Sequence, residues 1–371
     1  MAVRIALSWC ASRLLLAAVV VVGAVALGAP AAQRTSGTWG WLAERFTWWD
    51  SWHYVRIAEQ GYLPPGLSCC DQAFFPGYPA LMAVLAPLFA GSVIAAGLVL
   101  SLLAGAVAAV LLHRLGELQS PGSGRWAVVY LAVAPFGIFL SAVYTESLFL
   151  SLSLAAWLLG QRRRWALAGL AAAGACTVRV NGLFLVMALA VTYAMQMRAD
   201  GRRRPAREVL ALGLGPLAVL AHFGFLAVKT GDPVAWHRAQ STGWVREAAW
   251  PWEGLASGWQ AATSATSTDL VISRWADLLA VLAGGLLLLA LALLRRWDQA
   301  VLIALNLAVL VWSTMLTSSV RYALMWFPAY LLLGELSTRP RWGWLRWAVP
   351  AVCLPLLVLL SLEFATHRWV G

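Results

Sequence analysis

Long apolar stretches separated by short polar or basic segments occupy most of the chain. About twenty apolar residues are enough for an α-helix to cross a bilayer. On this pattern we predict an all-α polytopic membrane protein with about eleven spans, some of them short and therefore tilted or broken. The predicted spans lie near residues 14–32, 92–112, 126–143, 147–160, 165–178, 182–197, 207–228, 275–294, 299–316, 323–336 and 347–365.

Three other segments complete this organisation. The apolar piece 77–90 contains two prolines, so we expect it to be re-entrant or interfacial. The two long polar segments, 33–75 and 229–274, are predicted to be outer loops of a single membrane domain that covers residues 1–371. The first apolar run also resembles a cleavable signal peptide, but it is long enough to span, so we favour a retained helix.

Composition supports a membrane location. Hydrophobic residues make up 61% of the chain and charged residues only 12%, which excludes an ordinary soluble globule. The net charge of +11 comes from basic clusters between apolar spans, as the positive-inside rule predicts, so we expect membrane lipids as partners and no nucleic acid. With the N-terminus inside, the inner segments hold 17 of the 27 basic residues, including the cluster 198–207.

The densest set of polar side chains follows the first apolar run, in the stretch WWDSWHYVRIAEQGY at 48–62. Asp50 is placed to begin a short helix and Gly61 to end it. On such a helix Asp50, His53 and Tyr54 share one face. From local sequence alone, the simpler role of Asp50 is an N-cap.

The predicted topology brings several further polar motifs to the same side of the membrane as Asp50. These motifs are YTES at 144–147 with Glu146, RVNG at 179–182 with Arg179 and Asn181, GDPVAWHRAQ at 231–240 with Trp236 and Arg238, Arg246 in the same long loop, and the pair Arg321-Tyr322.

These motifs resemble a known family. WWDSWHYVRIAEQGY, followed by AFFPGYP at 73–79, resembles the first outer loop of the PIG-V-type mannosyltransferases, which add the second mannose to GPI anchors and have bacterial relatives. RVNG, GDPVAW and RY occur in the family's order. The resemblance implies a GT-C-type bundle, a polyprenyl-phosphate sugar donor carrying mannose, a lipid or glycolipid acceptor, and Asp50 as the catalytic acidic residue. The bacterial relatives favour a bacterial plasma membrane, and the charge-based topology puts the site on its extracytoplasmic face.

Transfer of a sugar from a lipid phosphate needs a base for the acceptor hydroxyl and positive charge for the departing phosphate. We assign Asp50 as the base, with His53 as the alternative. Arg179 and Arg321 are the main candidates for the phosphate, because each lies at a span boundary, where an unpaired charge is costly. Arg238 and Arg246 are further candidates, for which a solvated loop surface is an equal alternative, and Arg321 could instead snorkel to lipid headgroups.

The remaining candidates are expected to bind substrate. They are Tyr54, Glu146, Asn181, Trp236 and Tyr322. Glu146 could orient an arginine or a sugar hydroxyl, or cap a helix. Asn181 could lie in a turn close to a ligand or simply mark a helix break. Trp236 could stack on a sugar or dip into lipid.

Several absences narrow the function. The chain has no Asp-x-Asp pair, and its only lysine, Lys229, is not in a phosphate-binding glycine loop, which argues against a nucleotide-sugar enzyme or an ATP-driven pump. The five cysteines have no metal-ligand spacing, and the adjacent pair at 69–70 is an unfavourable disulfide. We assign no metal-ligating residues and expect no cofactor; dependence on a divalent metal stays an open alternative. The competing function is a transporter or flippase of a lipid-linked saccharide.

Overall fold

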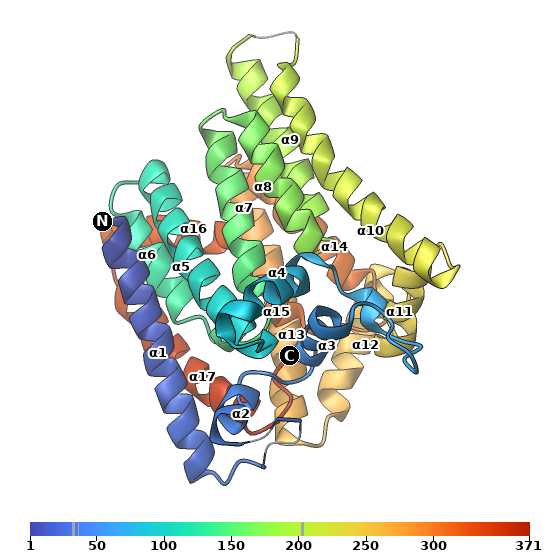
Figure 1. Cartoon of the computed structure of the whole chain (residues 1–371). Coiled ribbons are helices and arrows are strands. Elements are labelled where there is room, and N and C mark those ends of the chain that lie inside the picture. The colour runs from blue at the N-terminus through green and yellow to red at the C-terminus, as the bar shows by residue number, and fades with distance from the viewer. Residues whose placement is uncertain (32–33, 36, 202–203) are drawn as a thin grey trace.

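The computed structural model describes residues 1–31, 34–35, 37–201 and 204–371. In this part of the chain the regular secondary structure is helical, apart from one isolated β-bridge between Ala248 and Ser313 (Figure 1). Of the predicted basic cluster 198–207, Arg202 and Arg203 lie outside the described residues. The predicted all-α class is confirmed.

Six of the described helical segments are long and apolar enough to cross a membrane. Each corresponds to one of the predicted spans, although the first helix begins well before residue 14. The six are α1 (Ala2–Ala26), α5 (Val93–Gln119), α9 (Gly182–Ala199), η4 with α10 (Arg207–Gly213 and Leu214–Thr230), α13 (Thr268–Leu293) and η5 with α17 (Pro340–Trp342 and Leu345–Ala365).

The other five predicted spans are shorter helices. They are α6 (Ser123–Ala132), α7 (Glu146–Gln161), α8 (Trp165–Val178), α14 (Trp297–Val311) and α16 (Phe327–Thr338). The predicted span 323–336 is interrupted after α15 (Ser319–Leu324), because Pro328 in the first turn of α16 cannot continue the preceding helix. Together with the six long helices, these elements support a polytopic membrane protein.

The two predicted outer loops contain short helices of their own. The first holds α2 (Gly37–Glu44), α3 (Ser51–Gln60) and η1 (Asp71–Ala73), and the second holds α11 (Ala235–Trp244) and α12 (Pro251–Ser264). The apolar piece near 77–90 forms α4 (Gly77–Leu85) and η2 (Ala86–Phe89), which together are too short for the spanning criterion. The structure also joins Cys69 to Cys70 in a disulfide, a pairing that the sequence did not favour.

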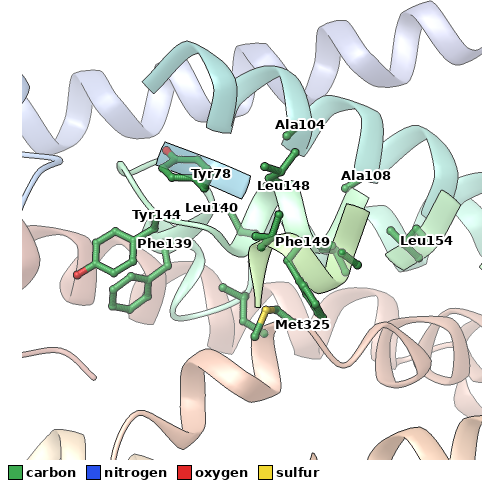
Figure 2. Packing of buried hydrophobic residues seen from close by; sticks show 14 of the residues in the cluster. Tyr78, Ala104, Ala108, Phe139, Leu140, Tyr144, Leu148, Phe149, Leu154 and Met325 are labelled. Atoms are coloured by element: carbon green, nitrogen blue, oxygen red, sulfur yellow. The ribbon is translucent and has the colours of Figure 1, made fainter. Parts of the chain in front are cut away.

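Small residues allow the central helices to pack closely. Ala108 on α5 is fully buried, and Figure 2 shows it with Ala104 beside the α7 side chains Leu148, Phe149 and Leu154. Tyr144, just before α7, packs edge-to-face on Phe139 of η3 (Gly137–Leu140). This core fixes the start of α7.

The short helices collect at one end of the bundle. Figure 1 shows α3, α11 and α12 in the region of the C-terminus, away from the C-terminal end of α9. Helix α11 packs against η1 and α10, and α12 against α13 and α14. The end of the bundle that carries these helices therefore also holds the junctions between α8 and α9 and between α14 and α15.

Candidate active site

Helix α3 presents Asp50 without using it as a cap. The helix begins at Ser51 and ends at Gln60, followed by Gly61 with a φ of 76°, as the sequence predicts. Asp50 occupies the N-cap position, yet its side chain makes no capping hydrogen bond. Its Oδ2 instead accepts a hydrogen bond of 2.6 Å from Nη1 of Arg321. The structure thus directs the Asp50 carboxylate into a tertiary contact.

Arg321 joins two carboxylates. Besides the bond to Asp50, its Nε and Nη2 each lie 2.9 Å from Oε1 of Glu146. The guanidinium is only 7% exposed and lies 4.7 Å from the ring centroid of Tyr144. Burial acts to lower the pKa of Arg321, but Glu146 and Asp50 more than offset it, so the pKa stands well above its ordinary value. Arg321 is therefore a permanent positive charge.

Arg179 binds the same carboxylate from a different helix junction. Helix α8 ends at Val178, Arg179 is extended, and α9 begins at Gly182. Nη1 of Arg179 donates to Oε1 of Glu146 at 3.0 Å and to the Thr145 hydroxyl at 2.8 Å. Glu146 is fully buried and its second oxygen, Oε2, makes no hydrogen bond in the described part of the chain. It orients two arginines, one of the roles expected for it.

A cavity of about 340 Å³ opens beside this network. This volume lies within the usual range for a small-ligand site. Most of the predicted site residues line it, and Glu146 lies directly behind them. The predicted residues that line the cavity are Asp50, Tyr54, Arg179, Asn181, Trp236, Arg246, Arg321 and Tyr322.

Hydrogen bonds fix the positions of two of these polar side chains. The Asn181 amide donates to Oδ1 of Asn306 on α14 at 3.0 Å, which ties the α8–α9 turn to α14. Nη2 of Arg246 donates to the carbonyl oxygen of Thr317 at 3.0 Å. Burial raises the pKa of Tyr54 to about 12, so its hydroxyl stays protonated at neutral pH. The pocket therefore offers a neutral hydroxyl next to fixed charges.

Two further predicted site residues do not line the cavity. His53 is not among the residues that line the cavity, because its Nδ1 pairs with Oδ1 of Asp71 at 2.9 Å and its ring stacks on Phe74. Arg238 is 69% exposed and pairs with Asp232 at 3.0 Å, so it belongs to a solvated loop surface. The roles expected of His53 as the alternative base and of Arg238 as a phosphate ligand therefore stay predictions, without a place at the cavity wall to support them.

Further aromatic residues line the cavity wall, and of these Phe74 and Trp369 were not predicted. Phe74 and Trp244 form one side, with ring centroids 5.5 Å apart. Trp369 reaches the cavity from the C-terminal segment, where its ring meets Trp49 edge-on at 4.9 Å. The only sequence signal was the abundance of tryptophan, which did not separate Trp369 from residues that face lipid. Within the described residues no group of three or more His, Cys, Asp or Glu side chains is placed to hold a metal ion.

These observations define the class of protein: a polytopic membrane protein whose candidate active site is a buried network of carboxylates and guanidiniums beside a cavity. The family described as Mannosyltransferase (PIG-V) matches residues 25–213, slightly more than half of the sequence. The chain belongs to this family.

Individual relatives agree with the family match. The chain is 37% identical over 149 residues to mouse GPI alpha-1,6-mannosyltransferase 2, and 36% identical over 149 residues to the human protein of that name. It is also 29% identical over 227 residues to GPI mannosyltransferase 2 of Chaetomium globosum. These alignments cover 36%, 37% and 52% of this chain but only 29%, 29% and 48% of the relatives, so the chain matches less than half the length of each.

Proposed function

We propose that the protein is a membrane glycosyltransferase that moves mannose from a polyprenyl-phosphate donor to a hydroxyl of a lipid or glycolipid acceptor. The observation that carries this proposal is the contact between Asp50 and Arg321 at the wall of the cavity, in a chain of the PIG-V family. In this contact a proton acceptor, Asp50, lies beside a fixed positive charge, Arg321. The reaction needs both groups.

In the proposed reaction Asp50 is the general base. Oδ2 of Asp50 is held by Arg321, whereas Oδ1 makes no hydrogen bond within the described residues and is left for the acceptor. The acceptor hydroxyl gives its proton to Asp50 as its oxygen bonds to the anomeric carbon of the sugar. The bond from that carbon to the phosphate oxygen breaks, and the phosphate leaves with the electron pair.

The arginines stabilise the charge that develops on the departing phosphate. Arg179 uses only Nη1 for Thr145 and Glu146, so Nε and Nη2 make no hydrogen bond within the described chain and are left for phosphate oxygens. Arg321 and Arg246 add positive charge on the same cavity wall. Because the site is largely buried, these charges act with little screening by water.

The position of the site favours a lipid-linked donor. Glu146 is the first residue of α7, Asn181 directly precedes α9, and Arg179 directly follows α8, so the network lies at helix ends. A transporter would instead hold its polar residues near the bilayer midplane. We assign this end of the bundle to the extracytoplasmic face of a bacterial plasma membrane, where a sugar must arrive on a carrier that has already crossed the bilayer.

The experiment is a direct comparison of donors. Purified protein receives radiolabelled mannose on either a polyprenyl phosphate or a nucleotide, together with extracted membrane lipids and no other enzyme. We expect labelled glycolipid only from the polyprenyl-phosphate donor. Transfer from the nucleotide sugar alone would contradict the proposal.

A further inference from the structure

The turn that leads into α15 has an unusual backbone. Helix α15 begins at Ser319 and carries Arg321 in its last turn. The preceding residue, Ser318, has a φ of 60°, in the left-handed region that non-glycine residues rarely adopt. A conformation of this kind persists only when surrounding contacts impose it.

Asp277 supplies such a contact from the middle of α13. Its side chain is almost completely buried, and its Oδ1 accepts hydrogen bonds from the backbone N–H groups of Ser319 at 2.6 Å and Val320 at 3.4 Å. These two residues immediately precede Arg321. A carboxylate bound to backbone N–H groups makes a charge-assisted hydrogen bond, which is stronger than a neutral one.

Two arginines hold the other side of the same turn. Arg246 donates from Nη2 to the Thr317 carbonyl at 3.0 Å, and Arg274 donates from Nη1 to the Leu316 carbonyl at 3.4 Å. Arg274 precedes Asp277 by three positions on α13, so the two side chains share a face of that helix. The backbone from Leu316 to Val320 is therefore fixed through carbonyls on one side and N–H groups on the other.

From these contacts we infer that Asp277 is a positioning residue for Arg321, acting through the turn 316–320. Asp277 touches neither the cavity nor Arg321 directly, as far as the described contacts go. By fixing the start of α15, it sets where the Arg321 guanidinium meets Asp50 and Glu146. This inference rests on the proposed function, because it assumes that Arg321 acts in the transfer reaction.

The test is a double-mutant cycle with purified protein and polyprenyl-phosphate mannose. Asp277→Ala should lower kcat about 10- to 100-fold, because small displacements of a charged group in a site have effects of that size. Asp277→Asn should lose only about 3- to 10-fold, since a neutral acceptor still bonds the two N–H groups. In an Arg321→Lys background either change should have much less effect than in the wild type, because both act through the same group.

Asp298 provides a matched control. It is also a buried acid, and it accepts hydrogen bonds from the Thr192 hydroxyl at 3.0 Å and from the Gln299 N–H at 2.8 Å. It lies in the first turn of α14, roughly 16 Å along the helix from Val309 at the cavity wall. Asp298→Asn should leave kcat close to the wild-type value, and its effect should combine independently with that of Arg321→Lys.

The possible outcomes distinguish the inference about Asp277 from the proposed function. If Asp277→Ala does not fold, the cycle is run with Asp277→Asn, and wild-type kcat in that variant overturns the inference. If the fold losses in kcat caused by the Asp277 and Arg321 substitutions simply multiply in the double variant, the inference is overturned as well. The proposed function then stands. Full activity of both Arg321→Lys and Arg321→Ala would instead refute the role of Arg321 in the proposed function.

Discussion

Nη1 of Arg321 donates to Oδ2 of Asp50 across 2.6 Å, although 271 positions separate the two residues in the chain. The contact joins the N-cap position of α3 to the last turn of α15. It also makes the proposed base depend on the positive charge, because removing Arg321 leaves Asp50 without its ion-pair partner, whereas removing Asp50 leaves Arg321 paired with Glu146 alone.

Arg321→Ala should cost about 2 to 4 kcal/mol of transition-state stabilisation, because the departing phosphate loses a charged donor in a poorly hydrated site. Arg321→Lys should recover only part of the loss, since an ammonium cannot contact Asp50 and Glu146 with a planar fork. The ratio of kcat/KM values for the polyprenyl-phosphate donor measures both effects. Equal activity of the lysine variant and the wild type would show that only charge matters.

Glu146→Gln should destabilise the fold by about 3 kcal/mol, because Arg179 and Arg321 lose the buried carboxylate that they share. The matched control is Glu363→Gln, whose partner Arg368 is 62% exposed and whose effect should stay within about 0.5 kcal/mol. Denaturant unfolding of the purified variants measures both. Equal losses at the two positions would contradict the structural role of Glu146.

Asp71 should make the fold sensitive to acid. Burial acts to raise its pKa, but hydrogen bonds from His53 and Arg56 more than offset it, so the folded pKa lies below the ordinary 3.8. Its contribution to stability is complete above pH 3.8 and is lost as the pH falls through the lower, folded pKa. The difference in unfolding free energy between wild type and Asp71→Asn should therefore shrink as the pH is lowered from 3.8 through the folded pKa of Asp71. A constant difference would rule out the ionised pair.

The proposed orientation is tested by labelling. In a cysteine-free background, a cysteine at Thr242, which is exposed in α11, should react with an impermeant thiol reagent in intact cells. A cysteine at Gly201, which is exposed after the end of α9, should react only after the membrane is opened. The reason is the excess of basic residues in the segments assigned to the inside. Reaction at position 201 from outside would reverse the assignment.

The sequence was sufficient for the class of fold, and most of the polar residues that it singled out line one cavity, because apolar length and charges at span boundaries are local signals. It correctly bounded α3 by Asp50 and Gly61. It did not show that His53 turns to Asp71 or that Asp277 holds α15, because both depend on tertiary contacts between distant segments. It overestimated helix length near 299–316 and 323–336, because the apolar composition continues past the end of α14 at Val311 and the end of α15 at Leu324.

The most direct test of the account is Asp50→Asn, which keeps the size of the side chain and removes the proton acceptor. Donor binding and transfer are measured separately on the same purified protein with polyprenyl-phosphate mannose. The account predicts donor binding close to that of the wild type and a transfer rate lower by about 10²-fold or more. Transfer at a near wild-type rate would show that Asp50 is not the base and that the chemistry occurs elsewhere.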